Sequence, residues 1–260
     1  MNRIEEVLNA NKQANKKSFI GYLTAGDPSI EQLPALVKAL ERGGCDVIEI
    51  GVPFSDPLAD GPVIQAAGQR AIEGGTSIYK IFESLASFRS SIHVPIAFLV
   101  YYNTLTIYGV EAFVKKCLEV GIDGLIIPDL PFEEQKELAD FLEGTSIALI
   151  PFATPTSKER MAFTLKNGSG FVYTVSSMGV TGRLSEFHAE LENYINEVKS
   201  YTSLPIAIGF GISTTDDVKR MSCLADAVIV GTAIVQKIHE SQANADVIEQ
   251  FVYSLVEGLE

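Results

Sequence analysis

The sequence predicts an α/β protein folded as a single (β/α)8 TIM barrel with a short helix at its N-terminus. Two observations carry this prediction. Eight short apolar runs alternate with longer helical patterns along the whole chain, and the chain has 260 residues, the length of one such barrel. The runs are apolar almost without interruption, which is typical of parallel strands covered by helices on one face and packed inside a barrel on the other.

The predicted elements follow one another in a regular order. The expected strands are Ser18–Thr24, Val47–Gly51, Pro95–Tyr101, Gly124–Pro128, Ala148–Phe152, Gly170–Val175, Pro205–Phe210 and Ala227–Gly231. The expected helices between them include Ile30–Arg42, Ile78–Phe88, Val110–Glu119, Pro131–Leu142, Ser157–Lys166, Leu184–Lys199 and Thr215–Met221. A further helix over residues 2–14 has apolar residues at Ile4, Val7 and Leu8, and we expect it to cover the N-terminal mouth of the barrel.

A doubly wound sheet is the competing α/β architecture. Such a sheet usually has fewer strands and carries a G-x-G-x-x-G turn after its first strand. The corresponding turn here, residues 24–28, reads TAGDP. Since no linker, low-complexity tract or shift in composition divides the chain, we expect one domain over residues 1–260.

The composition excludes some classes of partner. The net charge is −13, from 33 acidic residues against 20 Lys and Arg. Nucleic acids and anionic membrane surfaces both require clustered cations, so neither is expected as a partner. A phosphorylated small molecule remains possible, because backbone N–H groups bind phosphate without a lysine.

Targeting, membrane and metal signals are all missing. The first eight residues lack the apolar core and cleavage site of a signal peptide, and no apolar run approaches the roughly 18 residues of a membrane span. The cysteines Cys45, Cys117 and Cys223 are widely separated, and we expect them to be buried hydrophobic residues in a reducing compartment. No His or Cys spacing indicates a metal site. A cytoplasmic location is expected.

Glu49 is the strongest candidate for a catalytic residue. It lies inside the expected strand Val47–Gly51, among apolar residues that supply no cation. An ionised carboxylate in an apolar strand is costly unless it is paired or performs chemistry. Burial would raise its pKa toward neutrality, which suits proton transfer. The structural alternative is an outward carboxylate paired with Lys or Arg, or a buried one bound to backbone N–H groups.

Two more acids follow in the loop after this strand. Asp56 and Asp60 lie in a segment rich in Pro and Gly, where aspartate is common because it forms turns. In a TIM barrel this loop leaves the C-terminal face, where active sites lie. Asp60, beside Gly61, is therefore a candidate second acid, although a plain turn residue is the alternative for both aspartates.

Two glycine clusters at successive strand ends indicate a phosphate site. They are Ile208–Ser213 and Val230–Ala233, after the seventh and eighth strands, where this fold commonly binds phosphate. The alternative is that both glycine clusters only form tight turns.

The glycine-bracketed segment Gly179–Arg183 after the sixth strand indicates a lid or a passive connection. Tyr101, Tyr102 and Tyr173 are either core aromatics or site residues.

The residue types that the expected strands lack narrow the possible reaction chemistry further. None of the eight expected strands contains a lysine, which disfavours a Schiff-base aldolase. No cluster of acids and histidines at strand ends indicates Mg²⁺ or Zn²⁺. The residues therefore favour cofactor-free acid–base chemistry on a phosphorylated substrate.

The segment Glu49–Pro62, EIGVPFSDPLADGP, resembles the signature of the tryptophan synthase α subunit family. Supporting matches run along essentially the whole chain, at residues 24–28 (TAGDP), 128–131 (PDLP), 155–156 (PT), 179–182 (GVTG) and 209–212 (GFGI). The resemblance implies a TIM-barrel lyase that cleaves indole-3-glycerol phosphate to indole and glyceraldehyde 3-phosphate in tryptophan biosynthesis.

The resemblance also implies roles for individual residues. Glu49 would transfer protons, and Asp60 would stabilise positive charge at the indole N–H. The residues implied to contact the substrate are Tyr22, Leu99, Tyr101, Tyr173, Phe210 and Thr181, the last also positioning Asp60. The residues implied to bind phosphate are Gly182, Gly211, Gly231 and Thr232. No metal is implied, and this chain would need no cofactor.

The family implies a partner as well. An α2β2 complex is expected, in which the β subunit carries pyridoxal phosphate, receives indole through a tunnel and faces the loops Pro53–Asp60 and Gly179–Arg183. Three alternatives stay open: another cofactor-free enzyme of phosphorylated sugars or anthranilates on the same barrel, a regulatory module that only activates a partner, and a stand-alone lyase that releases free indole.

Overall fold

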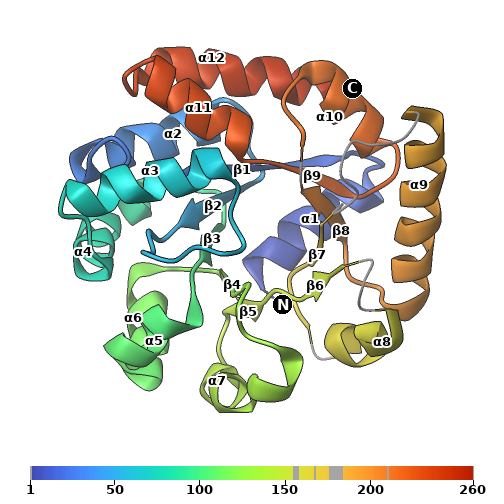
Figure 1. Cartoon of the computed structure of the whole chain (residues 1–260), viewed down its shortest axis with the longest axis horizontal. Helices are drawn as coiled ribbons and strands as arrows, with labels where there is room; N and C mark the ends of the chain where they lie inside the picture. Colours follow the sequence, from blue (N-terminus) through green and yellow to red (C-terminus); the bar gives the residue numbers. More distant parts are fainter. Residues whose placement is uncertain (1, 155–157, 167, 176–183, 210, 260) are drawn as a thin grey trace.

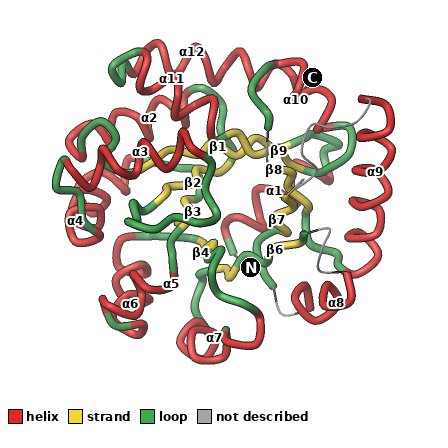
Figure 2. The backbone as a smooth tube through the Cα atoms, viewed as in Figure 1, coloured by secondary structure: helices red, strands yellow, loops and turns green. Residues whose placement is uncertain are grey.

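The computed structural model of the chain is a barrel of parallel strands wrapped in helices (Figure 1). It describes residues 2–154, 158–166, 168–175, 184–209 and 211–259, with the backbone alone for residues 158–160 and 184–189. Figure 2 shows the strands as an inner ring and the helices as an outer one. The predicted TIM barrel is confirmed.

The strands match the predicted positions to within a few residues at each end. They are β1 Ser18–Thr24, β2 Val47–Gly51, β3 Ile96–Leu99, β4 Gly124–Ile126, β5 Ala148–Leu149, β6 Phe152–Ala153, β7 Val172–Val175, β8 Ile206–Gly209 and β9 Ala227–Val230. Their order in the sheet is β5-β4-β3-β2-β1-β9-β8-β7-β6, and every pair is parallel.

The barrel closes through β5 and β6, which are two halves of the single strand predicted over Ala148–Phe152. The Ile150 N–H donates to the Leu125 carbonyl at 3.0 Å, toward β4. The Pro151 carbonyl, one residue later, accepts the Tyr173 N–H at 2.9 Å, toward β7. Proline has no N–H to donate, which explains why the ladder is interrupted at this residue.

The described helices include every predicted one and four that were not predicted. They are α1 Arg3–Gln13, α2 Leu33–Arg42, α3 Pro62–Glu73, α4 Ile78–Phe88, α5 Tyr102–Tyr108, α6 Val110–Val120, α7 Lys136–Leu142, α8 Lys158–Lys166, α9 Leu184–Tyr201, α10 Thr215–Ser222, α11 Thr232–Glu240 and α12 Ala245–Val256. The four that were not predicted are α3, α5, α11 and α12. The predicted helices that begin at Ile30 and Pro131 each start as a short 3-10 turn, Ile30–Gln32 and Phe132–Glu134.

The barrel interior is packed with small and β-branched side chains, and α1 closes its N-terminal mouth. The inner core consists of Ile4, Leu8, Ile20, Val47, Ala97, Ile126, Ala148, Ile150, Phe171, Ala207, Ala227 and Ile229. Ile4 and Leu8 come from α1, which crosses the middle of the ring in Figure 1. A Cβ on Gly124 would lie 2.7 Å from Ile4 Cδ1, so this glycine makes room for the helix. The predicted capping helix is confirmed.

The prediction that the three cysteines are buried is confirmed for two of them and wrong for the third. Cys45 and Cys117 are buried, as predicted, but Cys223 is exposed, and that prediction was wrong. Cys223 follows the last residue of α10, and its Sγ donates to the Lys219 carbonyl at 3.3 Å.

Within the part of the chain that the structure describes, no helix is long and apolar enough to span a bilayer.

Candidate active site

Glu49 points into the barrel from β2. Its Cα pairs with Tyr22 on β1 and with Ala97 on β3. Because side chains alternate along a strand, Val47 and Glu49 face the interior, while Ile48 and Ile50 pack against the helices. Two residues separate Glu49 from the C-terminal end of β2, so the side chain lies near the C-terminal mouth of the barrel.

The Glu49 carboxyl is fully buried and unpaired. Its exposed fraction is 0%, and neither oxygen has a hydrogen-bond partner among the described residues. Burial, and secondarily the charge of Asp60, raise the pKa of Glu49 from 4.5 to about 8. The structural alternative of a paired carboxylate therefore has no support from the described residues. A buried polar group left without a partner points to chemistry or to an absent ligand.

Asp60 reaches the same cavity from the loop between β2 and α3. A turn in which the Asp60 N–H donates to the Pro57 carbonyl at 3.0 Å shapes this loop. Burial raises the pKa of Asp60 from 3.8 to about 6, and hydrogen bonding from Tyr101 opposes part of that rise. Asp56, in contrast, is exposed, and its carbonyl accepts the Leu58 N–H at 3.0 Å. Asp56 thus takes the turn role, while Asp60 lines the cavity.

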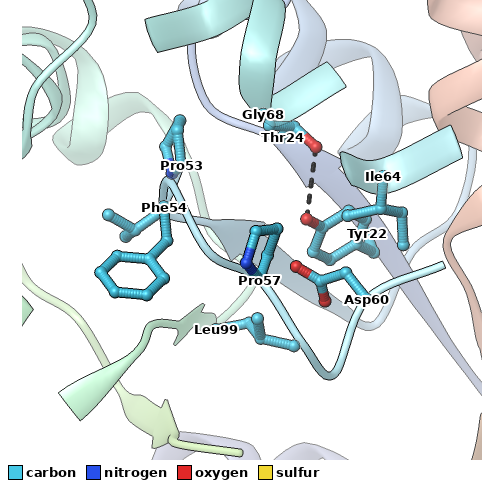
Figure 3. A pocket seen from close by; sticks show the side chains of 10 residues that line it. Tyr22, Thr24, Pro53, Phe54, Pro57, Asp60, Ile64, Gly68 and Leu99 are labelled. Carbon is cyan, nitrogen blue, oxygen red and sulfur yellow. Dashed lines mark hydrogen bonds between the residues drawn. The ribbon is translucent and has the colours of Figure 1, made fainter. Parts of the chain in front are cut away.

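A cavity beside Asp60 is bordered by β1, β3, the β2–α3 loop and α3, and Glu49 is not among the residues that line it. It holds about 250 Å³ of empty space and is lined by Tyr22, Thr24, Val52, Pro53, Phe54, Pro57, Asp60, Ile64, Gly68 and Leu99. Figure 3 shows the Asp60 carboxyl beside the Tyr22 ring of β1, with Leu99 of β3 also labelled at the cavity.

Two glycines make room for tyrosines at the inner face. A Cβ on Gly51 would lie 2.0 Å from the Tyr22 hydroxyl oxygen, and a Cβ on Gly209 would lie 2.9 Å from the Tyr173 ring. The Tyr22 hydroxyl also shares a 3.2 Å hydrogen bond with Thr24. Burial and the nearby charges of Asp60 and Glu49 raise the pKa of both tyrosines. Tyr22 and Tyr173 thus lie around the two acids.

The helix that follows β9 offers an open N-terminus beside this cavity. Gly231 is the N-cap of α11 and provides no side-chain cap, and Thr232, its first residue, is exposed. The first N–H groups of a helix have no partner within the helix and attract anions. A Cβ on Gly231 would lie 3.4 Å from the Tyr22 ring, which brings this helix start close to the acids.

The other predicted site residues are only partly placed. Gly211, after β8, is exposed and has φ +70°, which a glycine adopts without strain. β8 and β9 are neighbours, so the two glycine loops leave adjacent strands. Three predicted residues, Thr181, Gly182 and Phe210, lie outside the described residues, as does the segment Gly179–Arg183.

Sequence reasoning missed a buried ion pair that supports the site. Arg70 on α3 donates from Nε and Nη2 to the two carboxyl oxygens of Asp27, each at 2.8 Å, and Asp27 is only 2% exposed. The pair ties the loop after β1 to the helix that follows Asp60. Asp27 had been noticed only as part of a turn, and the partner 43 residues away is not visible without the fold.

Comparison with known proteins identifies one family. Residues 8–260 match the family model described as tryptophan synthase alpha chain. A tryptophan synthase alpha chain from Thermoanaerobacter sp. is 45% identical over 262 residues, covering 100% of both chains. One from Lachnospira eligens is 46% identical over 255 residues, covering 97% of each.

Solved structures agree with these relatives. Tryptophan synthase subunit alpha from Legionella pneumophila superposes with a TM-score of 0.91 at 31% identity, covering 100% of this chain and 98% of that one. The subunit from Campylobacter jejuni gives a TM-score of 0.86 at 39% identity, covering 94% and 98%.

Proposed function

This chain belongs to the tryptophan synthase alpha chain family, and we propose that it is a lyase that cleaves indole-3-glycerol phosphate to indole and glyceraldehyde 3-phosphate. One observation carries the proposal. Glu49 holds a fully buried carboxyl, unpaired among the described residues, near the C-terminal mouth of the barrel and close to Asp60. Two acids in different environments are what acid–base cleavage of a carbon–carbon bond requires.

Glu49 carries out both proton transfers in this reaction. It begins protonated and donates its proton to C3 of the indole, which makes a cationic indolenine. The Glu49 carboxylate then removes the proton of the C3′ hydroxyl, the C3–C3′ bond breaks, and its electron pair returns to the ring. Glu49 ends protonated, so no proton is gained or lost overall.

The environments of the two acids suit these roles. With a pKa of about 8, Glu49 holds its proton near pH 7, whereas Asp60, with a pKa of about 6, is mostly charged. A charged Asp60 stabilises the positive charge that develops at the indole N–H after C3 is protonated. The different environments of the two acids thus let Glu49 transfer the protons while Asp60 stays charged.

The family resemblance supplies the substrate contacts that we propose. We assign the indole and glycerol contacts to Tyr22, Leu99, Tyr101, Tyr173 and Phe210, and the orientation of Asp60 to Thr181. The phosphate contacts are assigned to backbone N–H groups of Gly182, Gly211 and Gly231, together with Thr232. The uncapped start of α11, close to Tyr22, supports the phosphate assignment.

We also propose that this chain works with a tryptophan synthase β subunit in an α2β2 complex. The β subunit would carry pyridoxal phosphate and use the released indole, so this chain would need no cofactor. The exposed Leu58, with 86% of its surface accessible on the loop that carries Asp60, supports a partner contact there. We further expect residues 1–260 to act as one domain in the cytoplasm.

The test is indole release from indole-3-glycerol phosphate by the purified chain, with and without a β subunit. Wild-type protein should release indole, the β subunit should raise the rate, and Glu49→Gln should abolish it. Glu111→Gln makes the same chemical change at an exposed position on α6 and should have no effect. A folded chain that binds glycerol phosphate but releases no indole under either condition would contradict the proposal.

A further inference from the structure

We propose that Tyr101 is a positioning residue, whose hydroxyl holds the Ala59–Asp60 end of the β2–α3 loop over the cavity and orients the Asp60 carboxylate. The role of Asp60 in the reaction rests on the proposed function. The contacts that carry the inference do not.

Tyr101 contacts the loop at two points. Its hydroxyl oxygen accepts the Ala59 N–H at 3.0 Å. Its ring stacks on Phe54 with centroids 4.8 Å apart and planes 15° from parallel. Since the hydroxyl accepts from Ala59, its own proton remains available to the Asp60 carboxylate, whose pKa the hydroxyl lowers. One side chain thus holds the loop at Phe54 and at Ala59, the residue before Asp60.

Tyr101 is itself firmly anchored at the junction of β3 and α5. The residue is 3% exposed, and its carbonyl accepts the Thr104 N–H at 2.9 Å in the first turn of α5. The next N–H, that of Tyr102, donates to the Asp129 carboxylate at 2.8 Å. Asp129 lies in the loop after β4, so two adjacent strand ends fix the backbone that carries Tyr101. The loop is therefore held by a rigid neighbour.

The same hydroxyl separates the charge states of the two acids. The titratable groups that face Asp60 are Glu49, Tyr22, Tyr173 and Tyr101. Tyr101 lowers the pKa of Asp60, whereas Glu49 has no hydrogen-bond donor among the described residues. Without the Tyr101 hydroxyl, the pKa of Asp60 should rise toward that of Glu49, and less of Asp60 would be charged when substrate binds.

The test uses Tyr101→Phe, which keeps the ring and its stacking on Phe54 but removes the hydroxyl. Tyr102→Phe is the matched control, because its hydroxyl is directed toward Glu137 on α7 at 3.4 Å. The first readout needs no substrate: hydrogen exchange at the Ala59 amide, followed by NMR, should be at least about tenfold faster in Tyr101→Phe and unchanged in Tyr102→Phe. The second readout is the pKa of the Asp60 carboxyl, measured by carbon NMR with the signal assigned through Asp60→Asn. This pKa should be higher in Tyr101→Phe than in the wild-type chain.

The third readout is the pH dependence of indole release. Activity requires charged Asp60 and protonated Glu49, so kcat/KM should fall below about pH 6 and above about pH 8 in the wild-type chain. In Tyr101→Phe the acidic limb should move upward, and kcat should fall about tenfold while KM changes little, because the oriented charge acts in the transition state.

These readouts distinguish a positioning role of the Tyr101 hydroxyl from a role of Tyr101 in lining the cavity. Unchanged Ala59 exchange together with an unchanged Asp60 titration would overturn it, even if activity falls. A rise in KM alone would also overturn it. If Tyr101→Phe does not fold, Phe54→Leu should still speed Ala59 exchange without moving the Asp60 titration. If the wild-type chain releases no indole, the proposed function fails, but the two NMR readouts still test Tyr101.

Discussion

Buried carboxylates at the two mouths of the barrel have opposite hydrogen-bonding environments. At the N-terminal mouth, Asp123 is 6% exposed and accepts hydrogen bonds from Arg3, from Arg89 at 2.9 Å and from the Ile96 N–H at 2.8 Å. At the C-terminal mouth, Glu49 is 0% exposed and has no such partner among the described residues. The first arrangement pairs the carboxylate with cations and an N–H group, and the second is the environment from which we propose that Glu49 transfers protons.

The N-terminal pattern is repeated around the barrel. Asp46, Asp123 and Asp226 each precede a strand and accept an N–H at the start of a neighbouring strand, from Phe19, Ile96 and Ile206 at 2.8, 2.8 and 2.9 Å. Each also binds α1, through Asn11, Arg3 and Lys12 respectively. These acids therefore attach the capping helix to the strand ends. No comparable donor set surrounds Glu49 in the described residues, and that difference supports the proposed catalytic role of Glu49.

The largest expected effect falls at the C-terminal mouth. Glu49→Gln keeps the shape of the side chain but can neither donate nor accept the transferred proton. Indole release should fall by about 10³-fold or more, since general acid–base groups contribute about 10²–10⁴-fold and both steps use Glu49. Steady-state assays of indole release with a folded variant would measure this. A loss of less than about tenfold would remove Glu49 from the chemistry and weaken the contrast with Asp123.

Asp123→Asn should lower the stability of the fold and leave activity unchanged, whereas Glu49→Gln should abolish activity. It leaves Arg89, whose side chain is 11% exposed, without its carboxylate partner, and breaking a buried ion pair costs about 3 kcal/mol or more of unfolding free energy. Urea titration at pH 7 would measure the loss. Activity per folded molecule should be unchanged at a temperature where the variant is folded. A stable variant with poor activity would mean that the two mouths are coupled.

The pH dependence of stability gives a third test. The pKa of Glu49 is about 8 in the folded chain and about 4.5 when the carboxyl is solvated, so the folded state binds more protons between these values. The Glu49 contribution to unfolding free energy is therefore fully present below about pH 4.5 and is lost as pH rises through 8, with a slope of at most about 1.4 kcal/mol per pH unit.

The measurement compares wild type with Glu49→Gln by denaturant unfolding from pH 5 to 9. Glutamine does not titrate, so the variant should gain stability relative to wild type as pH rises and then level off above about pH 8. A difference that stays constant across this range would mean that Glu49 has an ordinary pKa. In that case Glu49 would be charged near pH 7 and could not begin the reaction as the proton donor.

The smallest effect is expected at the exposed edge of the N-terminal network. Lys12 binds Asp226 at 3.2 Å, but 46% of the Lys12 side chain is accessible. Exposed ion pairs contribute about 0–1 kcal/mol, so Lys12→Met should change the free energy of unfolding by less than about 1 kcal/mol. Added salt should reduce that difference further. A loss comparable to that of Asp123→Asn would show that α1 depends on each attachment rather than on its buried face.

Much of the fold was predictable because its signals are local. Glu49 is the one acid in the apolar run Val47–Gly51, which marked it as unusual, although the run alone left open whether its side chain faces inward or outward. The helix α3 was missed because its apolar residues follow the proline-rich loop directly, so the whole stretch was interpreted as one functional loop. The signal was present in Pro62, which stands at the start of α3, and in Ala67 and Ala71, which are buried four residues apart.

By itself, the sequence determined the order of strands and helices, the α/β barrel and the candidate acids Glu49 and Asp60 within its family signature, because periodicity and motifs depend on residues close together in the chain. Only the tertiary structure decided that β5 and β6 close the ring, that the described residues leave Glu49 unpaired while Asp123 is bonded, and that Tyr101 reaches Ala59 from the end of β3. Those outcomes depend on burial and on partners about 27 to 120 residues away, which no local pattern encodes.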